Sequence, residues 1–187
     1  MKEILLVTGG CRSGKSRFAL EYANKNYENK VYIATCEAKD KEMQERIRRH
    51  QQDRGPDWKT VEEPIALSGA VNLYKFKAQI ILIDCLTFWV SNLLMKGEDE
   101  KLIMQRLEEL TDAIQERECT TVLVSNEVGA GIVPVNPLAR QFRDIIGSVN
   151  QRIAAIADDV VWMVAGIPVF IKRNHLGVRM DGPEKTF

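Results

Sequence analysis

Residues 9–16 read Gly9-Gly10-Cys11-Arg12-Ser13-Gly14-Lys15-Ser16 and match the pattern G-x-x-x-x-G-K-[ST]. They follow an apolar run, Ile4-Leu5-Leu6-Val7, and precede a helical pattern over residues 15–23. A strand before the glycines and a helix after them are the setting in which this pattern forms a phosphate-binding loop. The alternative is a glycine-rich turn with a chance Lys-Ser pair, and the two flanking elements favour the phosphate-binding loop.

Each part of this loop has a predicted role in binding a nucleotide. The glycines allow backbone N–H groups to turn inward around phosphate oxygens, and the following helix directs its positive end at the same oxygens. We expect Lys15 to contact the outer phosphates and act in catalysis, and the Ser16 hydroxyl to bind Mg²⁺. The sequence therefore predicts that all of residues 9–16 bind nucleotide.

Length and composition limit the chain to one domain. Of its 187 residues, 45% are hydrophobic and 28% are charged, which suffices for one core but not for two ordinary domains. We expect a single nucleotide-binding domain over residues 1–172 and a polar tail over 173–187. Acidic and basic residues balance at 26 each, so we expect no nucleic-acid partner.

The cysteines and histidines argue against a zinc site. Cys11, Cys36, Cys85 and Cys119 form no C-x-x-C pair, and the chain has only 2 histidines. We therefore expect reduced cysteines in a cytoplasmic protein. The chain starts with a strand pattern rather than a basic and apolar leader, and polar side chains interrupt its most apolar stretch, residues 80–95. Neither secretion nor a membrane span is expected.

Hydrophobic patterns predict alternating strands and helices. Apolar and extended segments predict strands over residues 4–8, 31–35, 58–61, 79–84, 120–125, 160–164 and 169–171. Amphipathic patterns, with Asn136-Pro137 as one start signal, predict helices over 15–23, 39–53, 64–74, 86–94, 99–117 and 136–157. The last two strands are expected to pair antiparallel. The alternation predicts an α/β fold of three layers around a mainly parallel sheet, with ligands at the carboxyl ends of its strands.

Asp84 ends a buried strand, which is where proteins with a phosphate-binding loop place the acid that holds Mg²⁺. A carboxylate that caps the next helix is the alternative. The chain has Ser125-Asn126-Glu127-Val128 rather than the Asn-Lys-x-Asp sequence with which guanine-binding switch proteins recognise the base. A switch GTPase is therefore disfavoured, and we predict that Asp84 is a metal ligand together with Ser16.

His50 is one of only 2 histidines and lies near arginines at positions 46, 48, 49 and 54. One interpretation is a solvated histidine on a charged helix. In the other, a neutral imidazole attacks a phosphorus atom while guanidinium groups neutralise the phosphate oxygens. The nearby positive charge would also lower the pKa of the imidazole and keep it nucleophilic at neutral pH. The residues by themselves leave both interpretations open.

Several segments together resemble one enzyme family. They are Val7-Thr8 with the loop that follows, Tyr32-Ile33-Ala34-Thr35, Met43 through Arg54 with its core Arg46-Ile47-x-x-His50, Val124-Ser125-Asn126-Glu127-Val128-Gly129-x-Gly131-Ile132-Val133-Pro134, and Leu138-Ala139-Arg140-x-Phe142-Arg143-Asp144 through Asn150-Gln151-Arg152. They stand in collinear order across residues 4–172. The chain is thereby similar to the bifunctional adenosylcobinamide kinase / adenosylcobinamide-phosphate guanylyltransferase family of cobalamin biosynthesis.

The resemblance implies a RecA-like fold and two reactions. In the first, ATP or GTP phosphorylates the hydroxyl of the aminopropanol arm of adenosylcobinamide. In the second, GTP guanylylates His50 with release of pyrophosphate, and adenosylcobinamide phosphate takes the GMP to give adenosylcobinamide-GDP. The resemblance also implies a symmetric trimer with nucleotide sites near the subunit boundaries.

The resemblance further implies which residues contact the nucleotide. Besides residues 9–16 these are Ala34, Thr35, Cys36, Gln51, Gln52, Asp53, Arg54, Glu62 and Asp84. Arg49 stands where many relatives have a second histidine, which singles out His50 as the nucleophile. Phe88 and Trp89 are candidates for a subunit interface, with core packing expected for at least one of them.

Three alternatives to the two-step enzyme remain. A kinase for another small alcohol would bind nucleotide without forming a covalent nucleotidyl-enzyme. A nucleotide-dependent binding or switch protein would hydrolyse nucleotide slowly and transfer nothing to an acceptor. The third is a relative that keeps guanylyltransfer but has lost useful kinase activity. The intact Gly14-Lys15-Ser16 argues against this loss. Asp84 and Glu127, expected at the ends of neighbouring strands, are both candidates for the general base of the kinase step.

Overall fold

The structure is a computed structural model that describes residues 2–37, 45, 48, 54–55 and 57–173. The helix predicted over 39–53 therefore lies, apart from positions 45 and 48, outside the described residues. The same holds for His50, Gln51, Gln52 and Asp53, and for the tail after residue 173.

In the described part of the chain, seven strands form one sheet in the order β3-β2-β4-β5-β1-β6-β7. All neighbouring pairs are parallel except β6 and β7, which pair antiparallel as predicted. The strands are β1 (Ile4–Gly9), β2 (Lys30–Ala34), β3 (Trp58–Glu62), β4 (Ile80–Asp84), β5 (Thr120–Val124), β6 (Asp159–Val164) and β7 (Ile167–Arg173). The strand that leads into the glycine loop and the strand that ends in Asp84 are thus separated by β5.

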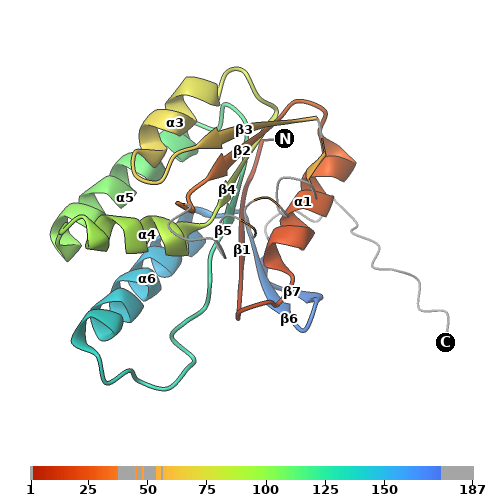
Figure 1. The fold of residues 1–187 in the computed structure, drawn as a ribbon. Helices are drawn as coiled ribbons and strands as arrows, with labels where there is room; N and C mark the ends of the chain where they lie inside the picture. The colour runs from red at the N-terminus through yellow and green to blue at the C-terminus, as the bar shows by residue number, and fades with distance from the viewer. Residues whose placement is uncertain (1, 38–44, 46–47, 49–53, 56, 174–187) are drawn as a thin grey trace, which may run out of the picture.

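Helices cover both faces of this sheet and make three layers (Figure 1). On one face α1 packs Phe18, Ala19 and Tyr22 against the strands. The other helices pack on the opposite face around Trp89 and a large set of aliphatic side chains. The helices are α1 (Lys15–Asn26), α3 (Leu67–Tyr74), α4 (Leu86–Met95), α5 (Glu100–Gln115) and α6 (Pro137–Ile156). This arrangement confirms the predicted three-layer α/β fold.

The two long helices, α5 and α6, each have a side-chain hydrogen bond that caps the N-terminus. The Asp99 side chain accepts a hydrogen bond from the Leu102 N–H at the start of α5. The Asn136 side chain accepts one from the Ala139 N–H, and Pro137 is the first residue of α6, as predicted. Each cap satisfies an N–H group that the helix itself leaves without a partner. No helix in the described part of the chain has the length and apolarity that crossing a bilayer requires.

Several element boundaries differ from the prediction by one to three residues, and the starts of α3 and β7 are two of them. The helix predicted from residue 64 begins at Leu67, because the Glu63 carboxylate accepts hydrogen bonds from the Ile65 and Ala66 N–H groups and holds them outside the helix. The last strand begins at Ile167 rather than at residue 169 and contains Pro168. A proline has no N–H to donate, and it is tolerated here because β7 is the edge strand of the sheet.

Candidate nucleotide site

The strand register brings residues from distant parts of the sequence into one row at the carboxyl edge of the sheet. Glu62 pairs with Ala34, Ala34 with Asp84, Asp84 with Val124, and Val124 with Val7. Side chains in register on parallel strands point to the same face. Here it is the face covered by α1, because Val7 and Val124 pack in the α1 cluster. Three of the predicted nucleotide contacts therefore share one face with the helix that follows the glycine loop.

Gly9 lies at the end of β1 against the backbone of β6. Its φ is 148°, and a Cβ built on it would stand 2.5 Å from the Met163 carbonyl oxygen and 2.9 Å from Ser13 Oγ. The Gly9 carbonyl in turn accepts a hydrogen bond of 3.0 Å from the Glu127 N–H. The loop can therefore turn at this point only because the residue has no side chain.

Gly14 directly precedes α1 as its N-cap and has the left-handed conformation, with φ 96°. Beside it, the Ser13 carbonyl accepts a hydrogen bond of 3.0 Å from the Gly166 N–H in the turn between β6 and β7. The C-terminal hairpin thus supports the loop from one side while the Glu127 backbone supports it from the other. The N–H groups at the start of α1 are held where they can bind an anion.

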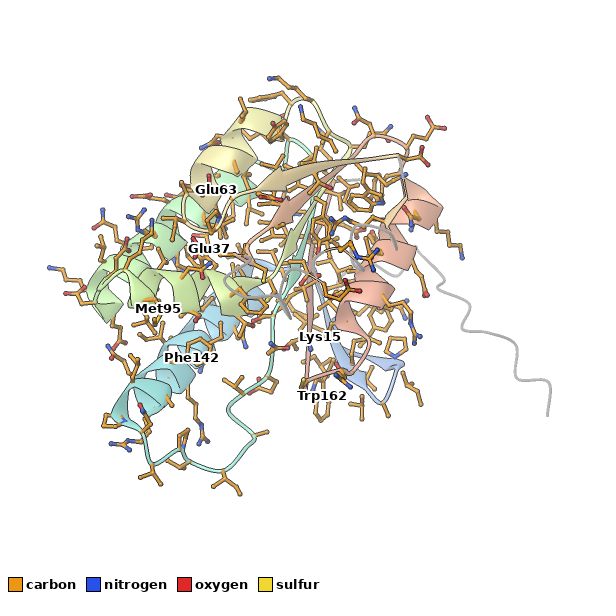
Figure 2. The ribbon with its side chains drawn as sticks, in the orientation of Figure 1. Lys15, Glu37, Glu63, Met95, Phe142 and Trp162 are labelled. Carbon is orange, nitrogen blue, oxygen red and sulfur yellow. The ribbon has the colours of Figure 1, made fainter. Side chains whose placement is uncertain are left out.

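Lys15 is a buried cation inside this loop, only 8% exposed. Its Nζ donates a hydrogen bond of 2.6 Å to the Gly10 carbonyl and lies 3.5 Å from Ser13 Oγ. Figure 2 shows Lys15 between the first turn of α1 and the ends of the central strands. The Lys15 ammonium group therefore lies inside the loop, where the predicted contact with the phosphates requires it. Ser16 follows it in the first turn of α1 and is half-buried, whereas Cys11 and Arg12 at the tip are exposed.

Thr35 ties the end of β2 to the start of α4. Its Oγ1 donates to the Cys85 carbonyl and accepts from the Cys85 N–H, both at 2.7 Å. The Thr35 carbonyl accepts a further bond of 2.8 Å from Asn92 Nδ2 on α4. Thr35 is fully buried, while Ala34 and Cys36 on either side are half-buried. The Thr35 hydroxyl therefore holds the backbone beside Asp84 in place.

Asp84 belongs to a cluster whose members come from different parts of the chain. Tyr32 Oη donates a hydrogen bond of 3.0 Å to Asp84 Oδ2. The guanidinium of Arg54 lies 3.8 Å from the centroid of the Tyr32 ring. The ring centroids of Tyr32 and Trp58 are 6.0 Å apart, and the two rings form a T-shaped pair. Burial and the Asp84 charge raise the pKa of Tyr32 well above its usual value, so its hydroxyl remains a donor at neutral pH.

The segment after β5 packs directly against the glycine loop. The Ser125 hydroxyl donates to Asn150 Oδ1 at 2.6 Å, and Asn150 Nδ2 donates to the Asn126 carbonyl at 3.1 Å. The Asn126 N–H donates to the Thr87 hydroxyl at 2.8 Å. These bonds fix the chain that places Glu127 next to Gly9. The half-buried Glu127 side chain accepts a bond from the Gly129 N–H.

The donor atoms present suit Mg²⁺ better than zinc. Within the described ranges no group of three or more His, Cys, Asp or Glu side chains could hold a metal ion. Ser16 and Asp84 offer a hydroxyl and a carboxylate oxygen, which are the hard ligands that Mg²⁺ prefers. Mg²⁺ at nucleotide sites is bound by one or two protein groups, with phosphate and water oxygens completing the shell. The residues therefore fit this ion.

The strand that contains Tyr32 was predicted correctly, but Tyr32 was not among the predicted site residues. The signal available was one hydroxyl-bearing ring in an otherwise aliphatic strand, Val31-Tyr32-Ile33. Most of the described residues of the predicted site come from the loop, the row at the strand ends or the cluster around Tyr32, and Thr35 and Cys36 directly follow the end of β2 beside that row.

The loop geometry and the strand order together define a nucleotide-binding protein with a phosphate-binding loop. The strand order agrees with the RecA-like arrangement, in which another strand separates the loop strand from the acidic strand. The solved structure of an ATPase domain has a similar fold, with a TM-score of 0.55 and 12% sequence identity over 97% of this chain and 78% of that chain.

The particular family follows from sequence comparison. Residues 5–171 match the family described as cobinamide kinase / cobinamide phosphate guanyltransferase, and the chain belongs to this family. The chain is 40% identical over 171 residues to the bifunctional adenosylcobalamin biosynthesis protein CobP of Pseudomonas aeruginosa, covering 91% of this chain and 98% of that protein. It is 42% identical over 181 residues to the bifunctional adenosylcobalamin biosynthesis protein CobU of Escherichia coli, covering 90% of this chain and 99% of that protein.

Proposed function

We propose that this chain phosphorylates adenosylcobinamide and then transfers GMP from GTP to the product, as a single transferase domain over residues 1–172. The observation that carries the proposal is the buried Lys15 inside a glycine loop at the same sheet edge as Asp84 and Glu62, which stand in one row at the strand ends. Membership of the cobinamide kinase / guanyltransferase family supports the choice of substrates.

In the kinase step the substrate hydroxyl attacks the γ-phosphorus of ATP or GTP. An O–P bond forms, the bond from the γ-phosphorus to the bridging oxygen breaks, and the nucleoside diphosphate leaves. Lys15 and the loop N–H groups stabilise the negative charge on the phosphate oxygens. Asp84 or Glu127 accepts the hydroxyl proton. Ser16 and Asp84 would hold Mg²⁺, which neutralises charge on the phosphates when bound.

In the guanylyltransferase step His50 is the nucleophile. Its imidazole nitrogen attacks the α-phosphorus of GTP, so that a P–N bond forms and pyrophosphate leaves. A phosphate oxygen of adenosylcobinamide phosphate then attacks the same phosphorus, which breaks the P–N bond and restores the histidine. We propose that Ala34, Thr35, Cys36, Gln51, Gln52, Asp53, Arg54 and Glu62 contact the nucleotide during these steps.

The covalent intermediate provides the decisive test. Purified protein is incubated with Mg²⁺ and GTP labelled at the α-phosphate, without corrinoid, and acid-labile, base-stable label on the protein is measured. Wild type should be labelled and His50→Ala should not. His175→Ala is the matched control, because it removes the other histidine of the chain and should leave the label unchanged. An unlabelled wild type that still binds nucleotide would support a kinase with one activity.

We also propose that the chain forms a homo-oligomer, a trimer by family resemblance, in the cytoplasm. Exposed apolar residues on two segments support an oligomer. Ile132 and Val135 are 96% and 95% exposed on the loop before α6, and Trp162, Val169 and other apolar side chains are exposed on the β6–β7 hairpin. The presence of all four cysteines as thiols supports a reducing compartment. Trp89 is in the core, as expected for at least one of the two aromatic candidates, while Phe88 is half-buried.

A further inference from the structure

Tyr32 lies between the two groups that the proposed reactions require on this side of the sheet. It is 3% exposed and belongs to the core that α1 covers. Its hydroxyl donates to Asp84, and its ring contacts the Arg54 guanidinium and makes a T-shaped pair with Trp58. A single buried side chain therefore contacts both the acid at the end of β4 and the residue that follows the segment containing His50.

We propose that Tyr32 is a positioning residue for both transfer reactions, acting through its hydroxyl on Asp84 and through its ring on Arg54. This inference rests on the proposed function, since it assigns Asp84 to the kinase step and the segment containing His50 to the guanylyltransferase step. The two contacts use different parts of one side chain, so substitutions can separate them.

The hydroxyl contact follows from the strand register. Tyr32 pairs with Leu82, and Asp84 is two residues further along β4 on the same face. The tyrosine ring spans this offset, and Oη reaches Asp84 Oδ2 at 3.0 Å. A hydrogen bond to a charged group restricts the rotation of the carboxylate and fixes where its oxygens stand. Phenylalanine would keep the ring in the core and remove only this bond.

The ring contact anchors the chain next to His50. Arg54 is 7% exposed, and its guanidinium is 3.8 Å from the Tyr32 ring centroid, which is within the range of a cation–π contact. His50 precedes Arg54 by four residues, so the chain allows it to lie at most about 14 Å from this anchor. Phenylalanine would keep the anchor, because its ring also attracts a guanidinium, whereas leucine would remove it.

The experiment compares wild type with Tyr32→Phe, Tyr32→Leu and Tyr22→Phe. Tyr22 is the matched control because it is also buried on the α1 side and also donates its hydroxyl to a carboxylate, that of Glu3, away from the site. For each protein we would measure kcat and KM for cobinamide phosphorylation, the rate of labelling by α-labelled GTP, nucleotide affinity and the melting temperature.

We expect Tyr32→Phe to lower the kcat of phosphorylation about tenfold, since a hydrogen bond to a charged group is lost. Its KM for nucleotide and its labelling rate should stay within about twofold of wild type. Tyr32→Leu should lower both kcat and the labelling rate about tenfold or more. Tyr22→Phe should change neither reaction, whatever it does to the melting temperature.

Three results would overturn the inference. In the first, Tyr32→Phe phosphorylates at the wild-type rate. In the second, Tyr32→Phe loses labelling as strongly as phosphorylation. In the third, Tyr22→Phe shows the same losses as Tyr32→Phe and has a similar melting temperature to that variant. The last result would mean that the effect is one of core stability. Failure of the proposed function is distinguishable, because the wild type itself would then neither phosphorylate cobinamide nor take up label, and this inference would fail with it.

Discussion

At the scale of the residue, Gly9 shows why the glycine loop tolerates no side chain at one position. A Cβ there would meet the Met163 carbonyl at 2.5 Å, and its φ of 148° disfavours any L-residue. Overpacking of this kind costs about 1–3 kcal/mol. If the loop shifts to relieve it, nucleotide affinity should fall about tenfold to a hundredfold.

Titration calorimetry of Gly9→Ala with GTP would check this loss of affinity. Gly69→Ala is the matched control, because Gly69 is exposed on α3 and a Cβ there would meet nothing within 4 Å. That control should bind GTP normally and gain about 0.5–1 kcal/mol in unfolding free energy. Normal GTP affinity in Gly9→Ala would contradict the packing argument.

The cysteines differ in environment and therefore should differ in reactivity. Cys11 is exposed at the tip of the glycine loop, whereas burial raises the pKa of Cys85 to about 12. We expect a maleimide to modify Cys11 rapidly, to block nucleotide binding through its bulk, and to leave Cys85 unmodified until the protein unfolds.

Peptide mass spectrometry after timed labelling measures both rates. Prior addition of GTP should protect Cys11, and Cys11→Ala should bind nucleotide after maleimide treatment. If maleimide-treated Cys11→Ala also lost nucleotide binding, a cysteine other than Cys11 would be responsible. The half-buried Cys36 would be the next cysteine to test.

At the scale of the element, the Thr35 hydroxyl joins β2 to the start of α4. It makes two hydrogen bonds of 2.7 Å with the backbone of Cys85 in a fully buried setting. Thr35→Val has the same shape but leaves the Cys85 N–H without this partner, while the Cys85 carbonyl still accepts from the Trp89 N–H. Because an unpaired buried polar group costs about 1–3 kcal/mol, we expect the free energy of unfolding to fall by about 1–3 kcal/mol.

Urea denaturation would measure this loss. Thr60→Val on β3 is the matched control, since Thr60 is an exposed strand residue and its replacement should change stability by less than about 0.5 kcal/mol. Equal stability of Thr35→Val and wild type would show that the two elements are held together by their apolar contacts alone.

At the scale of the whole molecule, two apolar surfaces lie near the end of the molecule where the glycine loop is. One is the loop before α6, which extends away from the body in Figure 1 and carries Ile132 and Val135. The other is a face of the β6–β7 hairpin with Trp162 and Val169, which pair in register. Exposed apolar patches of this kind mark protein interfaces.

We therefore expect the double variant Ile132→Asp, Val135→Asp to reduce the proposed homo-oligomer to monomers. Light scattering after gel filtration measures the mass. Leu73→Asp is the control, because it places the same charge on an exposed apolar position of α3, away from both apolar surfaces. An oligomer that survives the double variant would place the interface elsewhere.

Local patterns made most of the fold predictable. The glycine loop, the apolar runs and the helix start signals each depend on residues close together in sequence, and the three-layer sheet follows from their alternation. The start of α3 was predicted three residues too early, because Pro64 is typical of a helix start. In the structure the Glu63 carboxylate accepts hydrogen bonds from the Ile65 and Ala66 N–H groups, so the helix begins after them. The role of His50 remains a prediction, since it lies outside the described residues.

Neighbouring residues were enough to predict a glycine loop over 9–16 between a strand and a helix, and a buried strand that ends in Asp84, because both are local signals. The folded sheet was needed to show that β5 separates these two strands and that Glu62, Ala34 and Asp84 stand in one row. It alone placed Tyr32 between Asp84 and Arg54. The physical reason is that strand pairing joins segments far apart in the chain, and its register depends on the packing of the whole sheet rather than on any one segment.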